Sequence, residues 1–251
     1  MRKEYLIAGN WKMFKTVAES REFVQDLAKE FAAVAGLEVA VFPPFTALAA
    51  THGLDPKIKI GAQNMFFEEK GAFTGEISPL MLQDLADYVL VGHSERREIF
   101  AESDEVVNKK LRAALKFKLP PVLCIGETLP EREAGKTLLK VRQQLEKALQ
   151  GVAGADMEKI TVAYEPIWAI GTGRNATPEQ AQEVHHFIRQ TLQEIAPGSK
   201  IKILYGGSVK PENSLELLSQ EDISGVLVGG ASLKVDQFSA IIYNGLKLLR
   251  A

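Results

Sequence analysis

Short apolar runs alternate with longer amphipathic stretches from one end of the 251-residue chain to the other. The short runs are rich in Val, Ile and Leu and lack polar alternation, which is typical of strands buried on both faces of a parallel sheet. In the longer stretches apolar residues recur at helical spacing, as on the buried side of a helix. The pattern predicts strands at residues 5–10, 38–42, 58–62, 88–92, 122–126, 160–165, 201–206 and 225–229.

Two helix starts can be placed from the residues that precede them. Thr16 is followed three positions later by Glu19, and Thr177 is followed at the same distance by Gln180. In such a capping box each of the two side chains bonds a free backbone N–H at the start of the helix. Pro178 supports the second start, because proline fits the first helical position. We therefore expect helices to begin just after Thr16 and just after Thr177.

The order of these elements indicates the fold class. Eight strand-plus-helix units in a chain of this length predict an α/β protein with a closed (β/α)8 barrel, formed by a single domain over residues 1–251. The alternative is a doubly wound open sheet. Against it, the first strand is not followed by the G-x-G-x-x-G turn of dinucleotide-binding folds.

Composition narrows the class of function. Hydrophobic residues make up 46% and charged residues 25% of the chain, and the formal net charge is −2, so neither a nucleic-acid nor a membrane partner is indicated. The single cysteine, Cys124, excludes an intramolecular disulfide and a multi-cysteine metal site. No signal peptide and no apolar run near the ~20 residues of a membrane span is present. We therefore expect a soluble, cytoplasmic protein.

The most informative stretch runs from residue 162 to residue 173. An apolar strand delivers one carboxylate, Glu165, to its end, and Pro166 follows at once. The apolar residues 167–170 come next, and then a Gly171-Thr172-Gly173 turn. An apolar flap over a carboxylate fits proton transfer in a pocket from which water is expelled.

Unusual polar residues follow most of the predicted strands. In a barrel the carboxyl ends of all strands share one face, where active sites are built from the loops. Positions that are scattered in the sequence therefore become neighbours in space, and we expect them to form one site. The residues are Asn10, Lys12, Gln63, Asn64, His93, Glu165, Gly206, Gly207, Ser208, Gly229 and Gly230.

Of the histidines, His93 has a context that suggests chemistry. A helical turn is expected directly after it, and a helix N-terminus disfavours the imidazolium and so keeps the ring neutral. The other histidines lack this context and are interpreted as structural or exposed; they are His52, His185 and His186.

Four further residues have alternative interpretations. Lys12 is either a surface lysine or a site residue, and its position between apolar neighbours at the end of a strand favours the site. Glu95 and Arg97 either form an ion pair that braces the site or belong to a solvated charged turn. Cys124 has no basic neighbour in the sequence, so we interpret it as a packing residue and not as a nucleophile.

Glycine clusters occur on the last three of the expected loops: Gly171-Thr172-Gly173, Gly206-Gly207-Ser208 and Gly229-Gly230. Glycine lets backbone N–H groups approach an anion closely, and a short helix at Ala231-Ser232-Leu233 would point its positive end at the same place. Phosphate sites in this type of barrel are frequently made by these late loops.

Taken together, the motifs resemble the triosephosphate isomerase family, and they span nearly the whole chain in the expected order. The segments that carry the resemblance are Gly9-Asn10-Trp11-Lys12-Met13, Gly61-Ala62-Gln63-Asn64, Gly71-Ala72-Phe73-Thr74-Gly75-Glu76, Val91-Gly92-His93-Ser94-Glu95-Arg96-Arg97, residues 164–173, Tyr205-Gly206-Gly207-Ser208 and Val228-Gly229-Gly230.

The resemblance implies a TIM barrel isomerase of glycolysis and gluconeogenesis. It interconverts dihydroxyacetone phosphate and D-glyceraldehyde 3-phosphate through an enediol or enediolate, with no cofactor and no metal. The resemblance makes Glu165 the general base and His93 the electrophile, while Lys12 and Asn10 bind substrate and stabilise negative charge. It assigns phosphate binding to Gly171, Ser208, Gly229 and Gly230, and a supporting role to Glu95.

The resemblance also implies a lid and a partner. Residues 166–176 correspond to the closing lid, in which Arg174-Asn175 departs from the family's commoner residues. The loop 71–76 corresponds to an arm that inserts into a second subunit, with Thr74 near that subunit's site. Members of the family are homodimers in most cases and tetramers in some.

Two other functions remain open on the same barrel. One is an aldolase that uses Lys12 as a Schiff base, and the other is a non-catalytic scaffold. Retention of Glu165, His93, Lys12 and Asn10 together argues against the scaffold, and a coupled assay on dihydroxyacetone phosphate separates all of these possibilities.

Overall fold

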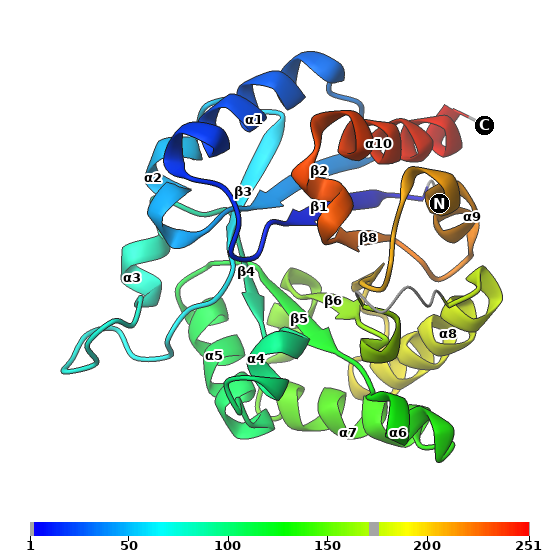
Figure 1. Ribbon diagram of the computed structural model, residues 1–251. Helices are drawn as coiled ribbons and strands as arrows, with labels where there is room; N and C mark the ends of the chain where they lie inside the picture. Colours follow the sequence, from blue (N-terminus) through cyan, green and yellow to red (C-terminus); the bar gives the residue numbers. More distant parts are fainter. Residues whose placement is uncertain (1–2, 171–175, 251) are drawn as a thin grey trace.

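Parallel strands follow one another around a closed barrel in the computed structural model, which describes residues 3–170 and 176–250 (Figure 1). Each strand pairs with the next, and β8 pairs with β1, so the closed barrel is confirmed and the open sheet is wrong. The predicted strands are all present, and their ends differ from the predictions by at most one residue. They are β1 Tyr5–Asn10, β2 Leu37–Phe42, β3 Ile58–Ala62, β4 Tyr88–Val91, β5 Pro121–Ile125, β6 Thr161–Tyr164, β7 Lys202–Tyr205 and β8 Gly225–Val228.

Helices surround the barrel and cover the outer face of its strands (Figure 1). The α-helices are α1 Val17–Glu30, α2 Leu48–Thr51, α3 Pro79–Leu82, α4 Ser94–Glu98, α5 Asp104–Lys116, α6 Leu129–Glu133, α7 Thr137–Leu149, α8 Pro178–Ile195, α9 Pro211–Ser219 and α10 Val235–Arg250. Short 3-10 helices are η1 Phe45–Ala47, η2 Gly154–Lys159, η3 Ile167–Ala169 and η4 Gly230–Leu233. None of the helices within the described ranges has the length and hydropathy needed to cross a membrane.

Both helix starts that the sequence predicts are confirmed. Thr16 caps α1 in a complete capping box with Glu19, and Thr177 caps α8 in the same way with Gln180. Pro178 occupies the first turn of α8, where its missing N–H costs no hydrogen bond.

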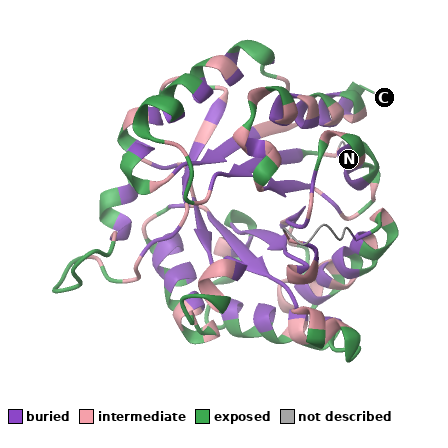
Figure 2. Cartoon of the chain, viewed as in Figure 1, coloured by how far each residue is buried: buried purple, intermediate pink, exposed green. Residues whose placement is uncertain are grey.

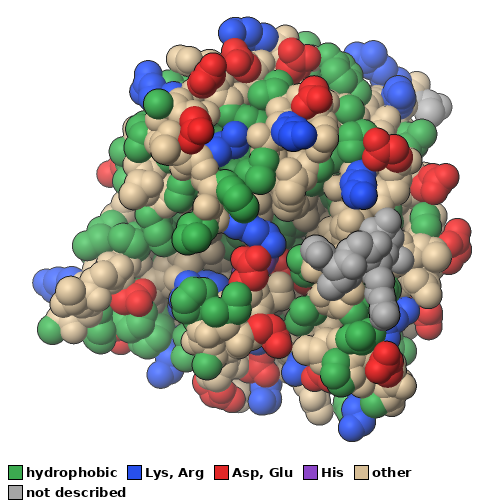
Figure 3. Space-filling model, in the orientation of Figure 1, with side chains coloured by type: hydrophobic (Ala, Val, Ile, Leu, Met, Phe, Trp, Pro, Cys, Tyr) green, Lys and Arg blue, Asp and Glu red, His purple; other side chains and the backbone are tan. Residues whose placement is uncertain are grey.

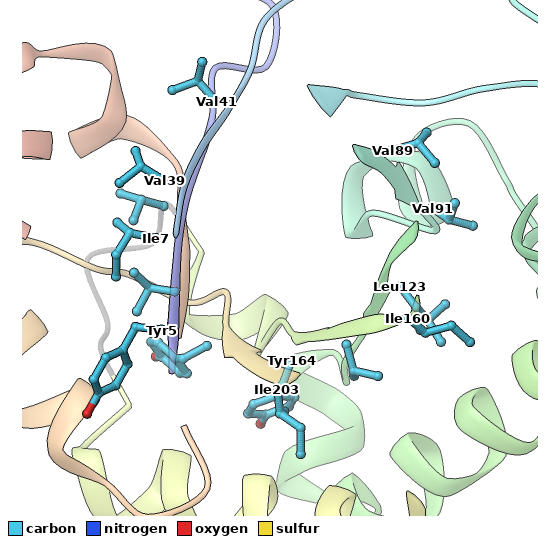
Figure 4. Packing of buried hydrophobic residues seen from close by; sticks show 14 of the residues in the cluster. Tyr5, Ile7, Val39, Val41, Val89, Val91, Leu123, Ile160, Tyr164 and Ile203 are labelled. Carbon is cyan, nitrogen blue, oxygen red and sulfur yellow. The ribbon is translucent and has the colours of Figure 1, made fainter. Parts of the chain in front are cut away.

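The strands are mostly buried (Figure 2), and in most of them alternate residues enter two apolar layers. One layer lies between strands and helices; Ile7, Val39 and Val41 belong to it and lie along their strands in Figure 4. The other layer fills the barrel itself with a mixture of large and small side chains, since a barrel of this size is a packed core and not a pore. Its buried members are Leu6, Ala8, Ala40, Phe42, Leu90, Val122, Cys124, Ala163, Leu204 and Leu227.

One glycine shows how tightly the interior is packed. A Cβ atom on Gly61 of β3 would lie 2.1 Å from the ring of Phe42 on the adjacent strand β2. Gly61 therefore makes the space that the Phe42 ring occupies inside the barrel.

The segment between β3 and α3 projects away from the barrel (Figure 1). Its tip, residues 71–76, is exposed throughout. Phe73 and Phe66 contact each other within the segment, with ring centroids 4.6 Å apart. The loop that corresponds, by resemblance to the family, to an intersubunit arm thus reaches outward from the molecule.

Candidate active site

The carboxyl ends of the strands open into a cavity of about 680 Å³. Side chains and loops from β1, β4, β6, β7 and β8 reach it, as expected for a barrel whose strand ends share one face. The residues of the sequence prediction that line it are Asn10, Lys12, His93, Glu165, Gly206, Gly207, Ser208, Gly229 and Gly230. Gly171, the remaining predicted phosphate binder, lies outside the described residues.

A carboxylate and an imidazole face each other in the cavity. Glu165 Oε1 lies 3.0 Å from His93 Nε2, and the exposed fractions of the two side chains are only 3% and 7%. The second oxygen, Oε2, accepts a hydrogen bond of 2.8 Å from the backbone N–H of Ser94. The pair is therefore nearly dry, and both carboxylate oxygens have donors.

Burial and hydrogen bonding act in opposite directions on this pair. Burial raises the pKa of Glu165, but attraction to His93 and hydrogen bonds from His93 and Ser94 outweigh it and bring the pKa below its ordinary value. Burial lowers the pKa of His93, but the facing Glu165 carboxylate and nearby Glu95 raise it above its ordinary value. Removing the hydrogen bonds while keeping the burial would make Glu165 a stronger base.

The helical turn that was predicted after His93 is confirmed as α4, and His93 is its N-cap. Its ring Nδ1 accepts a hydrogen bond of 3.2 Å from the backbone N–H of Glu95. An N–H pointing at Nδ1 opposes protonation there and leaves the proton on Nε2, which faces Glu165. This geometry fixes the tautomer of the ring, whereas the raised pKa of His93 opposes the expectation of a neutral imidazole.

Lys12 adopts a backbone conformation that is unusual for a lysine, with φ of 52°. Its N–H donates to Asn10 Oδ1 at 3.0 Å, and its carbonyl accepts from Gln63 Nε2 at 2.8 Å. Residues held in such conformations cluster at functional sites, because the surrounding structure must enforce them. The side chain ends in an ion pair, with Nζ 2.6 Å from Glu95 Oε1.

Of the two alternatives for Glu95 and Arg97, an ion pair between them is wrong. Glu95 pairs with Lys12, whereas Arg97 Nη1 pairs with Asp104 Oδ1 at 2.6 Å. The physical reason is helix geometry, since side chains two positions apart on a helix such as α4 point in different directions.

The late glycine loops are packed closely around the site. A Cβ atom on Gly206 would lie 2.9 Å from Glu165 Cγ, and one on Gly207 would lie 2.2 Å from the hydroxyl of Tyr205. The short helix expected after the last strand is confirmed as η4, which starts at Gly230 beside the cavity. Lys210 and Gln237 also line the cavity, and no sequence pattern had indicated them.

The first part of the lid, residues 166–170, is anchored at its root. Trp168 Nε1 donates to Glu127 Oε1 at 2.9 Å, and the Tyr164 hydroxyl donates to the same fully buried carboxylate at 3.1 Å. Ile170 lines the cavity, as an apolar flap should. The sequence analysis did not identify Glu127; its place directly after the predicted strand 122–126 was the available signal. The lid residues Arg174 and Asn175 lie outside the described residues.

The remaining sequence predictions concern residues away from the cavity. Thr74 is exposed on the projecting segment and does not line the cavity of its own chain. Cys124 is fully buried, and burial raises its thiol pKa well above the ordinary value, so the packing interpretation is confirmed. His185 is buried and His186 exposed, in line with structural or surface roles. Within residues 3–170 and 176–250, no group of His, Cys, Asp or Glu is arranged to hold a metal ion.

Comparisons with known proteins agree with this geometry. The family model described as Triosephosphate isomerase matches residues 5–245. A triosephosphate isomerase of Carboxydothermus hydrogenoformans is 54% identical over 252 residues, which cover 96% of this chain and 98% of the relative. Those of a Roseiflexus species and of Dictyoglomus turgidum are 52% and 48% identical, over 95% and 96% of this chain and 96% and 99% of the relatives.

Proposed function

Because the chain belongs to the triosephosphate isomerase family and is an isomerase of dihydroxyacetone phosphate and D-glyceraldehyde 3-phosphate, we propose that Glu165 is its general base and His93 its electrophile. The observation that carries this assignment is the dry contact of 3.0 Å between Glu165 Oε1 and His93 Nε2 inside the cavity. A proton must leave a carbon next to a carbonyl and return to the adjacent carbon. A carboxylate that accepts the proton and a ring N–H that stabilises the charge on the carbonyl oxygen supply the two functions that this reaction requires.

Glu165 becomes a stronger base when substrate displaces its present partners. Hydrogen bonds from His93 and Ser94 lower the pKa of Glu165 in the absence of substrate. When substrate binds, the ring N–H of His93 would donate to a substrate oxygen instead of to Glu165. The carboxylate would then remain buried with fewer hydrogen bonds, and burial alone raises its pKa. The same exchange brings the Nε2 proton of His93 to the oxygen on which the enediolate charge develops.

Lys12 and Asn10 bind substrate and stabilise this charge. The Lys12 ammonium already forms an ion pair with the Glu95 carboxylate, so a substrate oxygen must compete with that carboxylate for the ammonium. The backbone N–H groups of Ser208, Gly229 and Gly230 bind the phosphate beside η4. Gly171 shares this role by resemblance. Binding energy from the phosphate, which does not react, then stabilises the closed and reactive state of the lid.

A second copy of the chain completes the assembly through residues 71–76. The projecting segment carries an exposed Phe73, and an apolar side chain in water at the tip of an extended loop is better explained by a partner surface. Figure 3 shows hydrophobic side chains gathered on the side from which this segment extends. Thr74 then lies near the active site of the second subunit. Single-domain organisation over residues 1–251, cytoplasmic location and independence from cofactors stay predictions.

The test is a coupled assay on both triose phosphates with the parent protein, Glu165→Gln and the exposed control Glu98→Gln. We expect Glu165→Gln to fold normally and to lose a factor of about 10²–10⁴ in kcat, the usual effect of a positioned base. The control should keep the parent rate. Near-normal turnover by Glu165→Gln would remove this residue from the role. Borohydride reduction with substrate present should trap no adduct on Lys12, whereas an aldolase would give one.

A further inference from the structure

One arginine bridges the ends of two barrel strands directly beside His93. Arg97 Nε donates to the carbonyl of Gly92 at 2.8 Å, and Nη2 donates to the carbonyl of Cys124 at 3.4 Å. Gly92 is the residue that follows β4, and Cys124 belongs to β5. The guanidinium is largely buried, with 10% of the Arg97 side chain exposed.

This bridge lies where the pairing of the two strands stops. The last paired residues of β4 and β5 are Val91 and Leu123. Past that point the chain turns into α4, and Gly92 takes a φ of 72°, which a residue with a side chain rarely adopts. Arg97 therefore supplies the connection between the strands that backbone pairing no longer makes. Because the Gly92 carbonyl belongs to the peptide that leads into His93, the same bond fixes the backbone of His93.

The middle strand also determines where Glu165 lies. The backbone N–H of Glu165 donates to the carbonyl of Ile125, the last residue of β5, at 2.7 Å. His93 follows β4 and Glu165 follows β6, so β5 lies between the two reacting groups. Arg97 links β4 to β5, and the Glu165 amide links β6 to β5. The gap of 3.0 Å between the side chains is thus set across three strands.

The arginine is itself held by an anchored carboxylate. Asp104 Oδ1 accepts from Arg97 Nη1 at 2.6 Å, and Asp104 is the first residue of α5, where the helix dipole favours a negative charge. Lys147 of α7 lies 3.6 Å from the other carboxylate oxygen of Asp104. With such an anchor, the guanidinium cannot move without breaking an ion pair that is mostly shielded from water.

We propose that Arg97, anchored by Asp104, is a positioning residue that sets the geometry between His93 and Glu165 without touching the substrate. The inference rests on the proposed roles of His93 and Glu165. Arg97 is absent from the described residues that line the cavity, so it acts through the backbone of its neighbours.

The experiment compares Arg97→Lys with Arg189→Lys. Arg189 is a matched control, because it also joins a backbone carbonyl, that of Ile201, to a carboxylate, that of Asp222, but on α8 and away from the cavity. Lysine keeps the positive charge and loses the planar fork of donors. We expect both variants to lose stability, and we expect only Arg97→Lys to lose kcat, by a factor of about 10–10², with KM changed by no more than about twofold.

A purely structural role predicts a different result. If Arg97→Lys keeps the parent kcat, or if Arg189→Lys loses as much kcat for the same loss of stability, the positioning role is wrong. Should Arg97→Lys fail to fold, Asp104→Asn decides the question, because it keeps every donor of Arg97 and removes the anchoring charge. The ring ¹⁵N resonances of His93 should shift in the Arg97 and Asp104 variants and stay unchanged in Arg189→Lys. A parent protein that does not isomerise triose phosphates would instead overturn the proposed function.

Discussion

Two buried histidines show how neighbours decide the behaviour of one residue type. His93 faces a carboxylate, which raises the pKa of its ring. His185 forms no ion pair with a carboxylate among residues 3–170 and 176–250: its Nδ1 lies 2.7 Å from the carbonyl of Ala181, and burial lowers the pKa of its ring to about 4. The ring of His185 therefore stays mostly neutral in the folded protein above about pH 4.

His185 should make stability depend on pH in a definite direction. The pKa of His185 is about 4 in the folded protein and about 6.5 in the unfolded chain. Between these two values the unfolded chain binds a proton at His185 and the folded protein does not. The free energy of unfolding should fall by about 3 kcal/mol between pH 6.5 and pH 4 from this residue alone. The free energy of unfolding, measured with urea at fixed protein concentration, should depend less on pH in His185→Gln than in the parent. The exposed control His186→Gln should show the same pH dependence as the parent.

Gly126 tests the close approach of strands at the site. A Cβ atom at this position would lie 1.8 Å from the backbone oxygen of Glu165. Gly126→Ala must push Glu165 away from β5, and we expect a loss of about 1–3 kcal/mol in stability and about 10² in kcat. Gly154→Ala is the control, because no atom lies within 4 Å of its Cβ position. Equal kcat values for Gly126→Ala and Gly154→Ala in the coupled isomerase assay would contradict this account.

At the scale of elements, the loops after the strands carry the site, and the helices that follow them hold the loops in place. The lid ends where α8 begins, and the start of α8 depends on Thr177. The Thr177 side chain accepts from the N–H of Gln180 at 3.2 Å, and the Gln180 side chain accepts from the N–H of Thr177 at 3.1 Å. The described end of the lid is thus tied to a helix of 18 residues.

Removal of this cap should destabilise the protein by a predictable amount. Thr177→Ala loses the side-chain oxygen and leaves an N–H at the start of α8 without its partner, which costs about 1 kcal/mol. Thr177→Ser keeps the oxygen and should stay close to the parent. Chemical denaturation measures both values, and an alanine variant as stable as the serine variant would show that the cap contributes nothing.

At the scale of the whole molecule, the barrel buries its apolar residues in two layers and leaves others exposed. Exposed side chains include Met13, Phe14, Phe73, Ile99 and Phe100. They follow different strands or lie on the projecting segment, and only the closed barrel brings their loops to one end of the molecule. A dimer would remove such side chains from water.

The proposed dimer predicts a change of mass on substitution of Phe73. Phe73→Glu places a charge at the tip of the arm, where burial against a partner would be costly, so the dimer should dissociate. Light scattering after size exclusion should report the mass of one chain, and activity should fall. Leu139→Glu, at an exposed apolar position on α7, should keep the parent mass. A parent protein that is already monomeric would refute the dimer directly.

Local patterns in the sequence were sufficient for the strands, the capped helices and the barrel. Periodicity reports burial directly, and Thr16 and Thr177 cap their helices through neighbours three residues away. The clustering of Lys12, His93 and Glu165 also followed from sequence, because a closed parallel barrel leaves one face for all strand ends.

Only the tertiary structure decided which charged groups pair. Lys12 and Glu95 are 83 positions apart, and Trp168 reaches Glu127 across 41 positions, so no local pattern contains either contact. The stretch around Glu165 shows the same division. Its sequence determined a carboxylate under an apolar flap, whereas the fold decided that His93 and Ser94 hold this carboxylate. The physical reason is that hydrogen bonds and ion pairs depend on distances of a few ångströms between elements, which strand register and helix packing determine together.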